Sequence, residues 1–151
     1  MSGLFLFYDM NNMEQLQQLK FPFPIRQQVL WGEMDAFNHI NNVIYFRYFE
    51  TGRIAFFNEA NLWDLLAENK IRIVVVKLDC NYVQEITYPA EIEIAVAIKK
   101  VGNSSLTVHH IVKKDGNIAA HGEGVIVATN PETGKSTPWT ESLKAAFAKW
   151  L

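Results

Sequence analysis

Cysteine is almost absent from this sequence, and three further absences narrow its class. A single cysteine among 151 residues excludes an internal disulfide framework. No apolar run approaches the roughly 20 residues that a membrane-spanning helix needs. The net charge is −2 and no dense tract of Lys or Arg occurs, which argues against a nucleic-acid surface and a polybasic membrane anchor. We therefore expect partners that are neither nucleic acids nor membranes.

Several motifs that carry chemistry are also missing. The sequence has no phosphate-binding P-loop, no dinucleotide fingerprint and no Gly-x-Ser-x-Gly elbow. His109 and His110 are adjacent in a predicted strand and so point to opposite faces, with His110 on the apolar one, which prevents a shared metal site. We predict that the protein uses no metal and no other cofactor. Residues 3–8 are apolar but follow no Lys or Arg, so we expect no signal peptide and a cytoplasmic location.

The composition suits one globular domain preceded by a short extension. Hydrophobic residues make up 49% of the chain and aromatic residues 13%, which is enough for an ample core. Residues 1–20 form an N-terminal extension in this interpretation, either a packing segment or a functional lid. Pro22 and Pro24 mark the entry into a domain of residues 21–151.

Residues 42–60 predict a buried helix, because they contain no Pro and their apolar side chains cover most of the helical circumference. The remaining polar residues form one stripe and predict an open edge: Arg47, Glu50, Thr51 and Asn58. The apolar period then changes to two. Strands are predicted over residues 25–31, 72–82, 91–99, 104–114 and 118–128, followed by a helix over residues 141–150. In the second of these strands, Val74, Val76 and Leu78 are expected on the buried face. The order predicts an α+β fold, one antiparallel sheet of about five long strands wrapped around one central helix.

The chemistry is expected where this helix begins. Asn38, Asn41 and Asn42 are turn or capping residues, so the chain enters the helix near Asn42 and leaves free backbone N–H groups there. Together with the positive end of the helix dipole, such groups bind an anion or polarise a carbonyl oxygen. Asp35 lies just upstream, where it is either a catalytic carboxylate or a turn residue.

The same stretch carries a family resemblance. Its motif is formed by Trp31, Gly32, Glu33, Asp35, His39, Asn41, Asn42 and Tyr45. It resembles the hotdog-fold acyl-CoA thioesterases of the 4-hydroxybenzoyl-CoA thioesterase type, and the likeness extends over residues 23–148. The chain departs from the common pattern at Asn38, where many members carry Gly. The resemblance implies a hotdog fold, hydrolysis of an acyl-CoA to a carboxylic acid and free coenzyme A, and a homodimer or homotetramer with shared sites.

The resemblance also implies roles for individual residues. Asp35 would attack the thioester or deprotonate a water, the Asn42 N–H would polarise the carbonyl, and His39 would act as a brace or a base. The predicted substrate-binding residues are Asn41 and Tyr45 near the helix, and Lys99, Lys100 and Ser104, which would contact the coenzyme A phosphates.

Other functions stay open at this stage. A hotdog dehydratase on hydroxyacyl thioesters and a non-catalytic acyl-thioester binding protein are the alternatives. Acyl carrier protein thioesters remain a second substrate class beside acyl-CoA. The acyl group itself depends on the shape of the pocket, which the sequence does not reveal.

Overall fold

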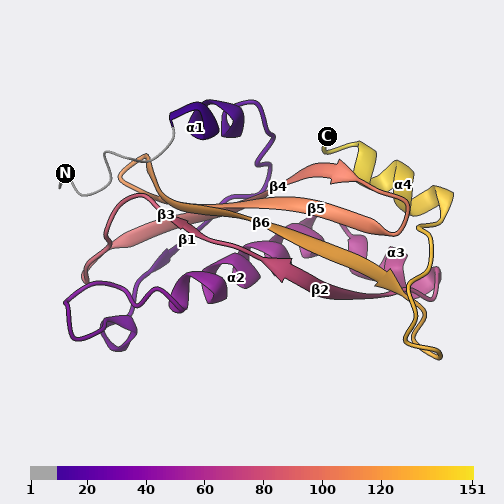
Figure 1. Ribbon diagram of the computed structural model, residues 1–151, viewed down its shortest axis with the longest axis horizontal. Coiled ribbons are helices and arrows are strands. Elements are labelled where there is room, and N and C mark those ends of the chain that lie inside the picture. Colours follow the sequence, from indigo (N-terminus) through magenta and orange to yellow (C-terminus); the bar gives the residue numbers. More distant parts are fainter. Residues whose placement is uncertain (1–9) are drawn as a thin grey trace.

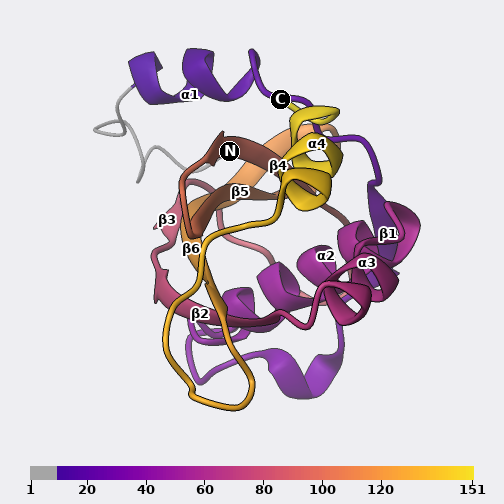
Figure 2. The same cartoon turned by 90° about the vertical axis from the view of Figure 1, so that its right-hand side faces the viewer.

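A curled antiparallel sheet dominates the computed structural model, which describes residues 10–151 and their side chains from residue 13 onward. The strand order is β1 (Ile25–Gln28), β4 (Glu91–Val101), β5 (Ser105–Lys114), β6 (Asn117–Thr129) and β2 (Arg72–Leu78), and the short β3 (Asn81–Tyr82) also pairs with β6. The sheet wraps around α2 (Ile44–Glu59), as Figures 1 and 2 show from two sides. The predicted α+β hotdog fold is therefore confirmed, with three long strands at its centre and shorter ones at its edges.

Helix α2 lies in the curl because most of its surface is apolar. Its buried residues are Tyr45, Tyr48, Phe49, Gly52, Phe56 and Phe57. A Cβ atom at Gly52 would meet methyl groups of Ile94 and Val96 at 2.9 Å, so this glycine lets the helix approach β4 closely. The predicted polar stripe is the side that the sheet leaves uncovered, and Arg47, Glu50 and Asn58 are exposed there.

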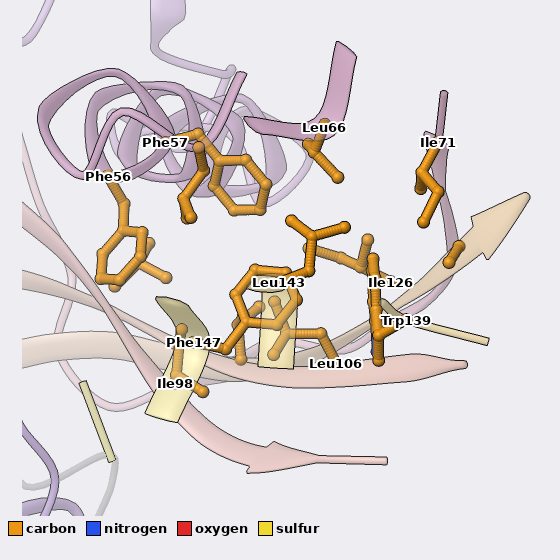
Figure 3. Packing of buried hydrophobic residues seen from close by; sticks show 14 residues of the cluster. Phe56, Phe57, Leu66, Ile71, Ile98, Leu106, Ile126, Trp139, Leu143 and Phe147 are labelled. Carbon is orange, nitrogen blue, oxygen red and sulfur yellow. The ribbon is translucent and has the colours of Figure 1, made fainter. Parts of the chain in front are cut away.

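The largest core cluster joins α2 to one end of the sheet. Phe56 and Phe57 face the strands, while α3 (Leu62–Glu68) and α4 (Glu141–Ala148) close this end of the curl (Figure 3). Trp139 and Phe147 pack edge to face with ring centroids 4.8 Å apart. The fully buried side chains that the sheet supplies to this cluster include Ile98, Leu106 and Ile126. This end therefore anchors the helix whose opposite end carries the candidate site.

The strict alternation predicted for the central strands is confirmed. Ile92, Ile94, Val96 and Ile98 are all buried on the inner face of β4. Asp115 and Gly116, with φ angles of 52° and 77°, form the predicted tight turn between β5 and β6.

The prediction of one continuous strand over residues 72–82 is wrong. The register shifts between Val75 and Lys77, which turns Val76 outward, and its side chain is 58% exposed instead of buried. The regular pairing ends at Leu78, and although the Asp79 N–H still donates to the Glu123 carbonyl at 3.0 Å, the Glu123 N–H donates to Asp79 Oδ1 at 2.9 Å. A side-chain oxygen thus takes the place of a ladder carbonyl, and pairing resumes only at β3.

Helix α1 (Met10–Leu16) covers part of the outer face of the sheet. Leu16 is buried against Ala95 of β4 and Ile111 of β5. The partly buried residues around this contact are Met13, Leu19, Phe21 and Ile118. The part of the predicted extension that the structure describes therefore packs on the fold, and residues 1–9 lie outside the described residues. Between residues 10 and 151, no helix has the length and apolar character needed to cross a membrane.

Candidate active site

The loop between β1 and α2 folds back on itself as a small antiparallel ladder. A single-turn helix, η2 (Trp31–Glu33), opens it, and an isolated bridge joins Met34 to Ile40. The Asp35 N–H donates to the His39 carbonyl at 2.8 Å, and the Asn41 N–H donates to the Glu33 carbonyl at 2.9 Å. Side chains alternate along such a ladder, so Ile40 enters the core. The polar side chains at 33, 35, 39 and 41 therefore share the other face.

The two oxygens of the Asp35 carboxylate differ in their hydrogen bonding. Its Oδ1 accepts the Phe37 N–H at 2.8 Å and the His39 N–H at 3.5 Å, which shapes the turn. Its Oδ2 accepts no hydrogen bond from any residue that the structure describes. Asn38 has a φ of 63°, a left-handed conformation that Gly adopts freely and Asn tolerates. The turn thus keeps the geometry of a Gly position with Asn in its place.

Two side chains from distant parts of the chain brace this loop. Glu33 Oε1 accepts the Leu30 N–H at 2.7 Å and the Tyr48 hydroxyl at 2.9 Å, so this carboxylate links the loop to α2. His39 Nε2 lies 3.0 Å from Glu85 Oε2. Tyr48 and Glu85 had no signal in the sequence, because only the fold brings them to the loop. The structure thus gives Glu33 and His39 bracing contacts.

Helix α2 begins with an unused donor. Asn41 Oδ1 accepts the Val43 N–H at 3.0 Å, and the Asn41 carbonyl accepts the Ile44 N–H at 2.9 Å. The Asn42 carbonyl accepts a hydrogen bond from the Tyr82 hydroxyl at 2.8 Å, which fixes the peptide between Asn42 and Val43 from the side of β3. The Asn42 N–H donates to no other group in the described part of the chain. The predicted donor is therefore open at the start of the helix.

Tyr45 lies in the core, unlike the polar residues of the loop. Its side chain is only 3% exposed and packs edge to face on Tyr48 and Tyr82. Burial raises the pKa of the Tyr45 phenol above its ordinary value, so the group stays protonated. Tyr45 supports the helix start from within the core cluster.

Lys99, Lys100 and Ser104 lie at the other end of the sheet. Gln28, near the loop, pairs with Glu91 at the start of β4, and Lys99 follows eight residues later. At about 3.3 Å per residue, Lys99 lies roughly 25 Å along β4 from the residue that pairs with Gln28. Lys99 also forms an ion pair with Glu123. The structure therefore brings Asp35, His39, Asn41 and Asn42 together and places the predicted phosphate contacts elsewhere.

A second polar cluster lies on the outer face of the sheet beneath α1. His109 Nε2 and His121 Nδ1 are 2.9 Å apart, and Glu123 lies beside them with Lys99. Burial lowers the pKa of both His109 and His121 to about 4. The sequence placed His109 and His110 on opposite faces, with His110 on the apolar one, which is confirmed, but it contained no sign that His109 is buried as well. In residues 10–151 no three His, Cys, Asp or Glu side chains are grouped to hold a metal ion.

The chain is similar to thioesterases in sequence and in structure. The profile of the thioesterase-like superfamily matches residues 29–147. The YsmA protein of Bacillus subtilis strain 168 is 36% identical over 126 residues, which cover 82% of this chain and 84% of YsmA. A thioesterase from Thermus thermophilus, solved with coenzyme A and Zn, is 30% identical with a TM-score of 0.74, over 86% of this chain and 94% of that one. A predicted thioesterase from Bacillus stearothermophilus is 26% identical with a TM-score of 0.76, over 85% and 96% of the two chains.

Proposed function

The chain belongs to the thioesterase-like superfamily, and from this membership we propose that it hydrolyses acyl-coenzyme A thioesters to a carboxylic acid and free coenzyme A. The observation that carries the proposal is that the start of α2 and the loop before it offer one unused hydrogen-bond donor and one unused carboxylate oxygen. The Asn42 N–H is unused at the start of α2, and Asp35 Oδ2 is unused in the loop before it.

In this proposal the thioester carbonyl oxygen accepts the Asn42 N–H. Negative charge develops on that oxygen in the transition state, and the positive end of α2 stabilises it. One such donor is typically worth about 3 to 4 kcal/mol of barrier. The peptide that carries the Asn42 N–H is held through its other end, because the Asn41 carbonyl accepts the Ile44 N–H at 2.9 Å. The Tyr82 hydroxyl holds the next peptide through the Asn42 carbonyl.

Asp35 promotes the attack on the carbonyl carbon by one of two routes. As a nucleophile, its Oδ2 forms a bond to the carbonyl carbon, the carbon–sulfur bond breaks, the thiolate leaves, and water hydrolyses the resulting anhydride. As a general base, Oδ2 takes a proton from a water whose oxygen attacks the same carbon. The carbon–sulfur bond then breaks, and the leaving thiolate takes up a proton. Glu33 and His39 hold the loop in both routes through Tyr48 and Glu85.

Coenzyme A is the favoured carrier of the acyl group because the related Thermus thermophilus thioesterase binds coenzyme A. Lys99, Lys100 and Ser104 remain the proposed phosphate contacts. They lie apart from the loop, on β4 and in the turn after it, so an extended coenzyme A bound at the loop of the same chain or of a second copy would have to reach them.

Replacing Asp35 by Asn tests the proposal. Asn keeps an oxygen for the Phe37 and His39 N–H groups but removes the negative charge, so turnover should fall by about 10²-fold or more with KM nearly unchanged. The measurement is release of free thiol from a panel of short, long and aromatic acyl-CoA substrates. Entry of oxygen-18 from water into the Asp35 carboxylate during one turnover identifies the nucleophilic route.

Asp64→Asn is the matched control, because Asp64 is an exposed carboxylate on α3, remote from the loop. It should keep wild-type turnover, and both variants should keep the wild-type melting temperature. Near-normal turnover of Asp35→Asn would contradict the mechanism. Hydration of enoyl thioesters without hydrolysis would instead favour the dehydratase alternative.

A further inference from the structure

A groove runs along the open edge of α2 toward β2, and one end of it lies at the candidate active site. Val43, Ile44 and Phe46 line the end near Asn42, and Leu78 of β2 forms the opposite wall. The volume of this groove is about 370 Å³, and a second hollow of about 260 Å³ continues it along the helix. Arg53 and Glu50 line both, and Arg47 lines the first. The walls are thus largely apolar, and the charged groups are concentrated where the two hollows meet.

Arg53 is fixed in this groove by a relay of hydrogen bonds. His110 Nδ1 lies 2.9 Å from the Gly122 carbonyl oxygen, which is an acceptor only, so Nδ1 carries the proton and donates. His110 Nε2 is then the acceptor for Arg53 Nη1, at 3.0 Å. The imidazole is fully buried and stacks on Phe49 with ring centroids 4.6 Å apart. The guanidinium is therefore oriented by a ring that cannot turn without breaking its packing.

The positive charge of Arg53 is not neutralised by this relay. Burial lowers the pKa of His110 to about 3, so the group that holds the guanidinium is neutral. Burial also lowers the pKa of Arg53, but a guanidinium stays protonated at neutral pH. No carboxylate of the described residues lies within 4.0 Å of Arg53, because Glu50 pairs with Arg47 at 3.1 Å. Glu50 acts on Arg53 only at longer range, where it partly offsets the lowering of its pKa, so these two arginines and one glutamate leave a net positive charge in the groove.

We propose that Arg53 binds a carboxylate at the far end of the acyl group, so that the preferred substrates are coenzyme A monothioesters of dicarboxylic acids. This inference rests on the proposed function, because it places the thioester at Asn42. Arg53 follows Asn42 by eleven residues, which is about 16 Å along a helix, and its side chain points back toward the helix start, which shortens the gap that the acyl group must span. The acyl group must therefore be extended, and suberyl- and adipyl-CoA should fit better than succinyl-CoA. Its methylene groups pack on Ile44, Phe46 and Leu78.

The experiment compares each dicarboxylic substrate with the monocarboxylic acyl-CoA of the same length. For the wild-type protein, kcat/KM for suberyl-CoA should exceed that for octanoyl-CoA by about tenfold or more, the size expected for a hydrogen bond between charged groups. Arg53→Met should abolish this preference, and Arg53→Lys should restore part of it. Arg26→Met removes an exposed arginine on β1 and should keep the wild-type preference.

A binding measurement keeps the test independent of turnover. Thioether analogues of suberyl- and octanoyl-CoA cannot be hydrolysed, and calorimetry gives their affinities for the wild-type protein and for Arg53→Met. Selective binding of the carboxylate-ended analogue, lost in Arg53→Met, would support the inference even if no thioester were hydrolysed. Equal affinities and equal rates in both proteins would overturn it while leaving thioester hydrolysis intact.

A carboxylate of a second copy of the chain is the competing occupant. In that case Arg53→Met would lower the mass seen by sedimentation and leave the ratio of suberyl- to octanoyl-CoA rates unchanged. That result would also overturn the proposal. The melting temperature of each variant shows whether the fold is kept, and Arg53→Lys separates loss of charge from loss of packing.

Discussion

At the scale of single residues, the fold keeps three histidines neutral by burying them. Burial lowers the pKa of His110 to about 3 and those of His109 and His121 to about 4, against an ordinary value of 6.5. In the unfolded chain each would bind a proton near pH 6.5. The unfolded state therefore binds more protons than the folded state as the pH falls below 6.5. Each such histidine should reduce the stability of the fold by about 1.4 kcal/mol per pH unit.

We therefore predict that stability is greatest above about pH 6.5 and declines as the pH falls toward about 4. His109→Gln removes one of the titrating groups, so its free energy of unfolding should depend less on pH between these limits. The hydrogen bond from Lys99 lowers the pKa of Glu123, so this carboxylate favours its charged form in the folded protein. Urea unfolding at a series of pH values measures the slope. Lys114→Gln on the same strand is the control, and a slope equal in all three proteins would refute buried neutral histidines.

The residues of the candidate site differ in how far the sequence could predict them. Asp35, Asn41 and Asn42 were found because their chemistry depends on local order, a turn followed by a helix start. Tyr48 and Tyr82, which anchor the loop through Glu33 and the Asn42 carbonyl, are 15 and 40 residues away from those partners. No spacing rule connects groups at such separations, so only the fold reveals them. The tautomer of His110 is likewise set by partners distant in the sequence, Gly122 and Arg53, so only the fold reveals it.

At the scale of elements, periodicity predicted the parts whose two faces differ. Helix α2 and strands β4, β5 and β6 separate apolar from polar positions clearly, and each lies close to its predicted range. The strand over residues 72–82 failed because a bulge reverses the alternation at Val76, and Asp79 then replaces a main-chain acceptor with its own carboxylate. Both events depend on the partner strand, β6, which the pattern of one strand does not contain.

Helix α1 gives a prediction about the N-terminal extension. Leu16 is 4% exposed between α1 and the outer face of the sheet. Leu16→Ala should lower the free energy of unfolding by about 2 to 3 kcal/mol, the lower part of the range for buried leucines, because only one helix covers this site. Urea unfolding followed by circular dichroism measures the change. Leu30→Ala is the control, since Leu30 is 63% exposed and its loss should change stability by less than about 0.5 kcal/mol.

An unchanged stability in Leu16→Ala would mean that α1 does not pack on the sheet in solution. Hydrogen exchange provides the second measurement. Amides of α1 should be protected in the wild-type protein and exchange faster in the variant, while amides of β5 should remain protected through their pairing with β4 and β6.

At the scale of the whole molecule, one edge of the sheet is unfinished. Among residues 10–151, strand β2 pairs with β6 and has no partner on its other side, and Val75 and Val76 on it are 44% and 58% exposed. Ile54 and Trp63, on the neighbouring helices, are 47% and 41% exposed. An uncovered strand with apolar side chains is a template for pairing with another chain. The sequence predicted this open side from the polar stripe of α2, but not its apolar border.

We therefore expect two copies to pair through β2, in a dimer or in a tetramer built from such dimers. This arrangement would cover the exposed valines and roof the groove that holds Arg53. Sedimentation should report a multiple of 17.3 kDa.

Val76→Lys places a charge on this edge and should shift the protein toward monomers, whereas Gln28→Lys, on the opposite edge strand β1, should not. If sites are shared between copies, thiol release by Val76→Lys should fall together with the dimer fraction as the protein is diluted. A monomeric wild-type protein with full activity would contradict the shared site.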